Sequence, residues 1–271
     1  QYLIKNVIYN GKKYSKEDMS WRILLFKHFN KIETWESLEK EFGDIKFDID
    51  FVDVANFLDK CMKEGHIIYN NAYMTTSLYE KSPSKKEYFG MPKVCSKARA
   101  YLLMFDTIYK KEKYLKNIIL KSSSMEELFN NIKGVYCNGN FNSMQFAIDL
   151  NYSEVFNFDE NEFIVPGPGA LRGINRCFEG QKKIQDYVEI IKWVQSNLDG
   201  LLVEKGYDIK FLPNRKPTLI DCQNIFCECD KYLRGIGSFQ EGVSGKRIKQ
   251  NFRESSDRIE YCFPIKWNVC L

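Results

Sequence analysis

The sequence predicts a mainly α-helical protein. Hydrophobic side chains recur three or four residues apart through most of the chain, and few segments alternate as strands do. Serine, threonine or aspartate precedes several of these runs and glycine follows some of them, as at helix ends. With 271 residues, of which 44% are hydrophobic, the chain can bury one sizeable core or two small ones. We expect a single domain over 1–271, with two lobes over 15–133 and 134–271 as the alternative.

The first half of the chain contains six predicted helices behind a short N-terminal arm. Short β-compatible runs flank the turn dipeptide Asn10-Gly11 and predict a small β element or an irregular arm within 2–14. In the helix that follows, Trp21 lies on the apolar stripe and Arg22 lies off it. The predicted helices cover 16–35, 34–42, 51–63, 93–113, 114–120 and 124–132.

A glycine- and asparagine-rich stretch leads into the next predicted helix, 142–150. Small residues ahead of a helix N-terminus can approach a base or a phosphate closely, but they can equally be a plain connection. On this helix the polar residues Gln145 and Asp149 lie one turn apart. The candidate base-contacting residues of the region are Tyr136, Asn138, Phe141, Gln145 and Asp149.

The segment 163–174, FIVPGPGALRGI, combines an apolar lead, a Pro-Gly turn and the start of a helix. Gly167 and Gly169 suit a tight turn because they lack Cβ. The N–H groups of such a turn, with a helix N-terminus behind it, can hold a phosphate oxygen. This is the pattern of a helix-hairpin-helix motif, so we expect Gly167, Gly169 and Ala170 to contact the DNA backbone.

The stretch 220–234, IDCQNIFCECDKYLR, is the candidate for chemistry. At about 3.6 residues per turn it presents an apolar stripe and a separate polar stripe. Asp221 follows Pro217 and an apolar run, so we expect it at the N-cap, a place that favours its ionised form. In the ordinary alternative Asp221 only caps the helix. The apolar stripe comprises Cys222, Phe226, Cys229 and Leu233, and the polar stripe comprises Asp221, Asn224, Glu228 and Lys231.

Two further features of this half of the chain have ordinary explanations beside the functional ones. Glu228 and Lys231 are spaced to form a solvated ion pair on one helix face. Asp186 stands seventeen residues after Gly169 on a predicted helix over 181–198. This spacing makes it an alternative to Asp221 as the catalytic carboxylate. It shares a polar face with lysines, however, as an ordinary surface carboxylate does.

Charge and hydropathy exclude some classes of protein. The net charge of +4 is mildly basic and does not by itself indicate a nucleic-acid partner. Beyond position 234, Lys246, Arg247 and Lys249 form a candidate strip for the phosphate backbone, with a solvated surface helix as the alternative. We find no run of eighteen apolar residues and no apolar centre of a signal peptide near the N-terminus, so we expect an intracellular protein that does not enter a membrane.

Cysteine and glycine patterns argue against several kinds of enzyme. The nine cysteines do not form paired C-x2-C motifs and only His28 and His66 could join them, so we expect reduced thiols and no metal site. Neither histidine stands in a recognisable nucleophile setting. No G-x-x-x-x-G-K-[ST] or G-x-G-x-x-G loop occurs, which disfavours a kinase or a dinucleotide enzyme, and we expect no cofactor.

Several blocks in order along the chain carry a resemblance to a known family. These are WRILLFKHFNKIETW, IIYNNAY, YCNGNFNSMQFAIDLNYS, FIVPGPGALRGINRCF and LIDCQNIFCECDKYLR, which together span about 21–234. They resemble helical, DNA-glycosylase-like proteins of thymine hypermodification. That family includes the helical domain of 5-hydroxymethyluracil DNA kinases, the α-glutamyl/putrescinyl thymine pyrophosphorylases and the amino acid:DNA transferases of phages. The resemblance implies DNA with a C5-substituted pyrimidine as the partner, with the base flipped into a pocket, and no protein partner is evident.

Three hypotheses of function follow. In the first, a DNA glycosylase reaction, Asp221 stabilises the positive charge that develops at C1′, while Gln223 and Asn224 read the base edge. Glu228 and Lys231 support that site. In the second, a transferase replaces a pyrophosphate on the C5 methylene with an amino acid or a polyamine, and basic residues gather at the leaving group. The candidates for that role are Arg22, Arg172, Lys231 and Arg234. In the third, the chain only binds modified DNA.

Overall fold

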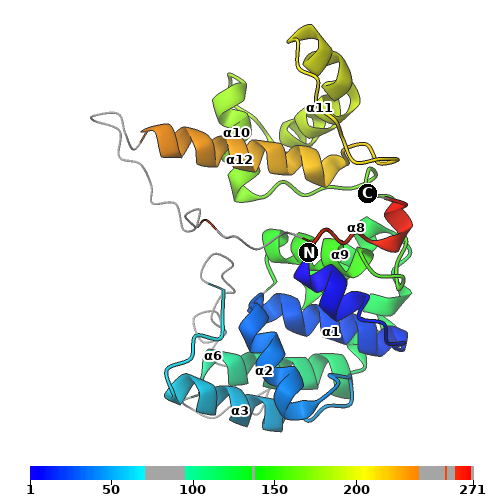
Figure 1. The fold of residues 1–271 in the computed structure, drawn as a ribbon, viewed down its shortest axis with the longest axis vertical. Helices are drawn as coiled ribbons and strands as arrows, with labels where there is room; N and C mark the ends of the chain where they lie inside the picture. Colours follow the sequence, from blue (N-terminus) through cyan, green and yellow to red (C-terminus); the bar gives the residue numbers. More distant parts are fainter. Residues whose placement is uncertain (71–94, 136–137, 238–253, 255–259, 270–271) are drawn as a thin grey trace. The chain divides into compact units, whose positions relative to one another are not determined.

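The computed structural model describes residues 1–70, 95–135, 138–237, 254 and 260–269 (Figure 1). It divides into two compact units. Unit 1 comprises Gln1–Asn157 with Glu260–Cys262, and unit 2 comprises Phe158–Ile259 with Phe263–Leu271. Every regular element within the described ranges is a helix and none is a strand, which confirms the mainly α fold class. None of these helices is long and apolar enough to span a bilayer.

Unit 1 is built from α-helices and short helical turns (Figure 1). Its α-helices are α1 (Lys16–Phe29), α2 (Ile32–Phe42), α3 (Phe51–Lys63), α6 (Lys97–Phe105), α7 (Tyr114–Asn117), α8 (Met125–Gly134) and α9 (Asn140–Asn151). Unit 1 also has two π-helical turns, η1 (Leu3–Ile8) and η2 (Asp106–Lys111), and one 3-10 helical turn, η3 (Ile119–Lys121), within the described residues.

The core of unit 1 surrounds α1. Trp21 is fully buried and stacks on Phe51 of α3, with 4.5 Å between the ring centroids. Trp35 and Leu38 of α2 are buried equally well. Because aromatic rings remove large apolar areas from water, this cluster supplies much of the stabilisation of the unit.

Three boundaries in unit 1 differ from the sequence-based prediction. The expected β element near the N-terminus is wrong, because η1 is a helical turn whose apolar residues Leu3, Ile4, Val7 and Ile8 are buried. The first helix stops at Phe29 rather than at 35, since Asn30 adopts a left-handed conformation with φ of 47°. The long helix expected over 93–113 is α6 followed by the π-helical turn η2.

Unit 2 contains α10 (Pro168–Cys177), α11 (Ile184–Glu204), α12 (Leu219–Gly237) and the short turn η4 (Ile265–Trp267). α12, shown in orange in Figure 1, is the central element: both α10 and α11 pack on it. Of the expected apolar stripe, Cys222 and Phe226 are buried, whereas Cys229 and Leu233 are only partly covered.

The chain divides between Asn157 and Phe158 rather than between 133 and 134. α9 stays in unit 1 because it packs on α8 and on α1. The assignment of 1–271 to a single domain stays a prediction.

Candidate functional site

Asp221 lies in the first turn of α12 but is not its N-cap. Its Oδ2 accepts hydrogen bonds from the backbone N–H of Thr218, at 2.9 Å, and from the Thr218 hydroxyl, at 3.0 Å. Thr218 precedes the helix, so Asp221 is the third helical residue and its side chain reaches back to the backbone N–H of the cap, which is one half of a capping box. The predicted N-cap position is therefore wrong by one turn.

A buried arginine ties this turn to two other segments. Arg215 donates from Nη1 to Asp221 Oδ2, at 2.7 Å, and from Nη2 to Glu160 Oε2, at 2.9 Å. Glu160 also accepts from Trp267 Nε1 at 2.8 Å, and the guanidinium of Arg215 lies 3.7 Å from the centroid of the Trp267 ring. We call these residues, Glu160, Arg215, Thr218, Asp221 and Trp267, the aspartate network. It holds Asp221 in place while leaving its side chain 38% exposed.

Lys266 lies beside Trp267, in the same C-terminal turn. Its Nζ is buried and has no hydrogen-bond partner among the described residues. Burial lowers the pKa of Lys266 to about 8, although the charge of Glu160 works in the opposite direction. The C-terminal turn therefore brings a lysine with a weakened proton affinity to the side of the network.

A second polar cluster lies further along α12, around Asp230. This carboxylate is fully buried and accepts three charged hydrogen bonds: from Arg172 Nε at 3.0 Å, Arg176 Nε at 3.2 Å and Arg234 Nε at 3.1 Å. We call these four residues the arginine cluster. Burial would raise the pKa of Asp230, but hydrogen bonds and charge from the arginines, Arg172 foremost, hold it below its ordinary value. The carboxylate is therefore ionised at neutral pH.

The predicted phosphate-binding turn has other partners. The N–H of Gly167 donates to Gln223 Oε1 at 2.9 Å, and the N–H of Ala170 hydrogen-bonds to the thiol of Cys227. Gly167 and Ala170 are buried. The expectation that this turn holds DNA phosphates is corrected, because the chain itself occupies these two donors. Gln223 is only 3% exposed and anchors the turn, so its predicted contact with a base edge is corrected as well.

Gly169 and Gly173 serve helix packing. Both lie inside α10 on the side that faces α12. A Cβ on Gly173 would stand 2.0 Å from the carbonyl oxygen of Phe226, and one on Gly169 would stand 3.0 Å from Cys227 Sγ. The two helices therefore touch through their backbones. The helix-hairpin-helix assignment is not supported, since a long irregular segment, 152–167, separates α10 from α9.

The remaining polar residues of α12 form an ordinary surface. Lys231 Nζ donates to Glu228 Oε1 at 2.5 Å, and both side chains are more than half exposed. Asn224 is exposed and accepts from Gln223 Nε2 at 3.3 Å. On α11, Asp186 accepts from the N–H of Lys183 and caps its own helix. A catalytic role for Glu228 or Lys231 stays a prediction, and the geometry around the two residues is that of a solvated ion pair.

Arg22 belongs to the core of unit 1, and its predicted contact with substrate is wrong. The side chain is fully buried. Its guanidinium donates to the carbonyl oxygens of Val7 and Ile45 and to the carboxylates of Glu39 and Asp44. With these partners the side chain is satisfied and inaccessible, so it stabilises the packing of the first helices.

Asp149 is also structural. It is 6% exposed, and its Oδ2 lies 2.8 Å from Lys27 Nζ, a buried ion pair between α9 and α1. Burial raises the pKa of Asp149, while the charge of Lys27 lowers it in part. Its predicted contact with a base is corrected, because the Asp149 side chain faces the core of unit 1.

The other candidates near α9 keep their predicted roles as expectations. Asn138 donates from Nδ2 to the carbonyl oxygen of Ile132, at 3.0 Å, and so ends α8. Phe141 is 42% exposed and Gln145 is partly buried. Tyr136 lies outside the described residues, as do the basic candidates Lys246, Arg247 and Lys249.

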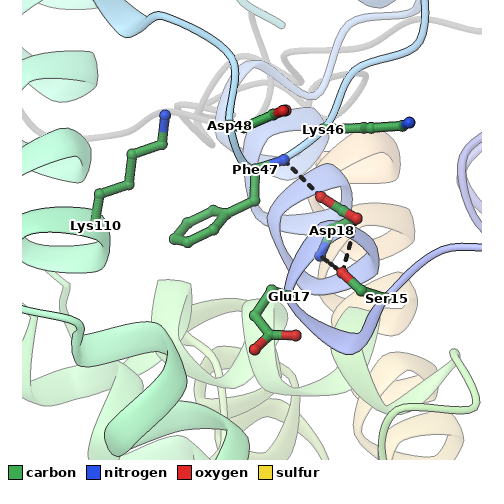
Figure 2. A pocket seen from close by; sticks show the side chains of 7 residues that line it. All are labelled: Ser15, Glu17, Asp18, Lys46, Phe47, Asp48 and Lys110. Atoms are coloured by element: carbon green, nitrogen blue, oxygen red, sulfur yellow. Dashed lines mark hydrogen bonds between the residues drawn. The ribbon is translucent and has the colours of Figure 1, made fainter.

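Unit 1 also has an open hollow of about 570 Å³ at the start of α1 (Figure 2). Three of its polar side chains, those of Ser15, Asp18 and Lys110, have structural partners. Asp18 accepts from the N–H of Phe47 at 2.8 Å and from the hydroxyl of Ser15 at 2.7 Å. Lys110 donates to the carbonyl oxygen of Ile49 and lies over the ring of Phe51. These contacts give no indication of a ligand, so we place the candidate site on α12.

Comparison with known proteins identifies the family. Residues 1–240 match the family described as 5-hmdU DNA kinase, helical domain. The chain belongs to this family. It is also 22% identical, over 259 residues, to the 5-hmdU DNA kinase of Bacillus phage SP10. That alignment covers 92% of this chain but 40% of the phage protein, so the chain spans less than half the length of its relative. No solved structure matches it.

In this member of the 5-hmdU DNA kinase helical-domain family, sequence reasoning missed four residues that the structure brings together. No motif in the sequence singles out Asp230 and Arg176, which belong to the arginine cluster, or Glu160 and Arg215, which belong to the aspartate network. A signal was present in the spacing: arginines at 172 and 176 lie on one face of a helix, and 230 and 234 are related in the same way. Only the fold shows that these two faces meet.

Proposed function

We propose that this chain binds DNA containing 5-hmdU, the nucleoside of 5-hydroxymethyluracil, or a derivative of it, and that it acts on the C5 substituent of the base. Two observations support this. The match to the helical-domain family covers residues 1–240, and the relative with 22% identity is named a 5-hmdU DNA kinase. The sequence contains no G-x-x-x-x-G-K-[ST] loop, so we assign base recognition and modification to this chain rather than phosphoryl transfer.

The observation that favours chemistry at C5 is the arginine cluster. Arg172 and Arg176 both pair with Asp230, so these two partly exposed guanidinium groups carry one more positive charge than that carboxylate neutralises next to α12. A phosphate or pyrophosphate group that leaves the C5 methylene needs such charge to stabilise it. In this reaction an amine attacks the methylene, a C–N bond forms and the C–O bond breaks. The leaving group takes the bonding electron pair, and the amine nitrogen loses a proton.

N-glycosidic cleavage is the second candidate, and the exposed part of Asp221 favours it. The three hydrogen bonds from Arg215 and Thr218 all reach Oδ2 of that residue. This arrangement fixes the orientation of a carboxylate that is still 38% exposed. A fixed carboxylate can stabilise an oxocarbenium-like sugar, as in glycoside hydrolysis. The same hydrogen bonds reduce the negative charge that it can offer, so we rank this reaction second.

One experiment separates these reactions. The full chain is incubated with duplexes that contain thymine, 5-hmdU or phosphorylated 5-hmdU, with and without an amine donor. Base excision gives strand breaks after alkali. Replacement at C5 gives a nucleoside of changed mass and no abasic site. Selective binding of 5-hmdU DNA without either product would reduce the proposal to recognition, and equal binding of all duplexes would reject it.

Substitution of Asp221 tests its role directly. In Asp221→Asn the amide keeps an oxygen for Thr218 but loses the charge that pairs with Arg215. If Asp221 supplies negative charge to the reaction, we expect turnover to fall by about a hundredfold or more. Asp199→Asn is the matched control, because Asp199 is an exposed carboxylate of unit 2 that pairs with Lys216. Equal turnover in the two variants would remove Asp221 from the chemistry.

A further inference from the structure

The arginine cluster has more positive charge than its own fold requires. Asp230 is fully buried, and one guanidinium is enough to neutralise it. Arg172, Arg176 and Arg234 all bind it nonetheless, although arginines that converge on one point repel one another. Arginine stays protonated throughout the physiological range, so the excess charge is permanent.

The geometry leaves two guanidinium groups available to a ligand. Arg172 and Arg176 both bind Asp230 through Nε, and their side chains are 51% and 42% exposed. Within the part of the chain that the structure describes, no hydrogen bond involves their terminal nitrogens. These nitrogens are the ends of the fork with which arginine binds phosphate oxygens in pairs.

The buried carboxylate also orients the two arginines. They are four residues apart on α10, so they extend from the same face of the helix. Each is held at Nε by a different oxygen of Asp230. A side chain that is already ordered loses little further entropy when it binds a ligand. The two side chains are thus ordered in advance, unlike a set of independent surface arginines.

We propose that Arg172 and Arg176, oriented by Asp230 and supported by Arg234, bind the phosphate oxygens of a multiply charged phosphate group. This assignment rests on the proposed function, and the expected ligand is a phosphate or pyrophosphate ester on the C5 methylene of the base. The phosphodiester backbone of DNA offers the same chemistry with a single charge per phosphate. The two sources are separated by the experiment below.

The first arm of the experiment uses inorganic pyrophosphate as the probe, with the full chain in low-salt, metal-free buffer. Calorimetric titration should show binding to the wild type and dissociation constants raised about tenfold in both Arg172→Gln and Arg176→Gln. Arg176→Lys keeps the positive charge but loses the planar guanidinium that can bind two oxygens at once, so the affinity of this variant for pyrophosphate should also fall. Lys205→Gln, which removes an exposed positive charge elsewhere in unit 2, should bind as the wild type does.

Two results would overturn the site. One is the absence of pyrophosphate binding by the wild type. The other is equal affinity in all variants, or an equal loss in Lys205→Gln, because both would mean that only overall charge matters. If an Arg→Gln variant lost its circular dichroism spectrum, Arg176→Lys would decide, since it retains the ion pair with Asp230.

The second arm identifies the source of the phosphate. Pyrophosphate is used to displace the chain from a duplex with phosphorylated 5-hmdU and from a thymine duplex. Displacement from the modified duplex alone supports the base-linked phosphate, and equal displacement from both supports the DNA backbone as the ligand. If all duplexes bind alike while pyrophosphate still requires Arg172 and Arg176, the proposed function fails and the anion site stands.

Discussion

At the scale of single residues, unit 1 buries charged and titratable groups that the sequence does not mark as internal. Arg22, Lys27, His28 and Asp149 are all less than 10% exposed. Each is surrounded by helices that converge from distant parts of the chain. Burial of such groups makes stability depend on their partners and on pH, which gives two predictions.

His28 should make unit 1 sensitive to acid. It lies against the rings of Tyr101 and Phe105, and burial lowers the pKa of its imidazole to about 3. Below about pH 6.5 the imidazole of His28 takes up a proton in the unfolded chain but stays neutral in the folded chain. The free energy of unfolding should therefore fall by about 1 kcal/mol for each unit by which the pH is lowered. His28→Phe should flatten this slope in urea unfolding between pH 6.5 and 4.

The other histidine provides the control for that measurement. His66 is largely exposed, so His66→Gln should keep the wild-type dependence on pH. Identical slopes in His28→Phe and in the wild type would show that other groups cause the acid sensitivity.

Loss of one partner of the ion pair between Lys27 and Asp149 should lower the free energy of unfolding more than replacement of both partners does. In Lys27→Met the carboxylate is left buried without a partner, and we expect the free energy of unfolding to fall by about 3–5 kcal/mol. In the double variant Lys27→Met/Asp149→Leu both charges are gone, so most of this loss should be recovered. Chemical denaturation of the single and double variants measures the difference. A double variant as unstable as the single one would contradict the assignment.

At the scale of elements, the close crossing of α10 and α12 organises unit 2. The glycines of α10 allow it, and the crossing brings Arg172 and Arg176 to Asp230. Gly173→Ala places a methyl group 2.0 Å from the carbonyl oxygen of Phe226, which is too close for two non-bonded atoms, so the helices must separate. We expect this overpacking to lower the stability of unit 2 by about 1–3 kcal/mol or more, measured by thermal unfolding.

Gly200 offers a matched control on the neighbouring helix. It lies inside α11, has no positive φ, and a Cβ there would meet no atom within 4 Å. Gly200→Ala should therefore stabilise the helix by up to about 1 kcal/mol. If both alanine variants changed stability alike, close packing at Gly173 would not be the cause.

These elements also show what the sequence can and cannot specify. The helices were predictable because their periodicity and caps are local, as the fit of 124–132 to α8 and 142–150 to α9 illustrates. The sequence suggested a turn at Gly169 because the residue that packs closely against it, Cys227, lies far along the chain. Asp230 was missed because its neighbours Glu228 and Lys231 are exposed, and only tertiary packing buries it.

At the scale of the whole molecule, the two units differ in how their cores are built. Unit 1 has a large aromatic centre around Trp21, whereas the described residues of unit 2 form three α-helices and the short turn η4. Regions with separate cores can unfold in separate transitions. Family membership covers both units, since the match extends over 1–240.

A fragment of residues 1–157 should fold alone. It contains the buried cluster around Trp21, Trp35 and Leu38. The fragment loses its contacts with the segment Glu260–Cys262, among them the exposed ion pair of Glu260 with Lys5, which contributes little. Thermal melting followed by circular dichroism should give one cooperative transition. A gradual, non-cooperative loss of signal would show that unit 1 depends on the rest of the chain.

The contact of Gly173 with Phe226 has one more consequence. Two helices whose backbones touch cannot slide or turn on each other without collision, so Arg172 and Arg176 of α10 keep a fixed position relative to Asp230 of α12. A receptor of constant width selects its occupant by size. A substitution at this glycine would therefore alter which anion is preferred as well as how firmly unit 2 holds together.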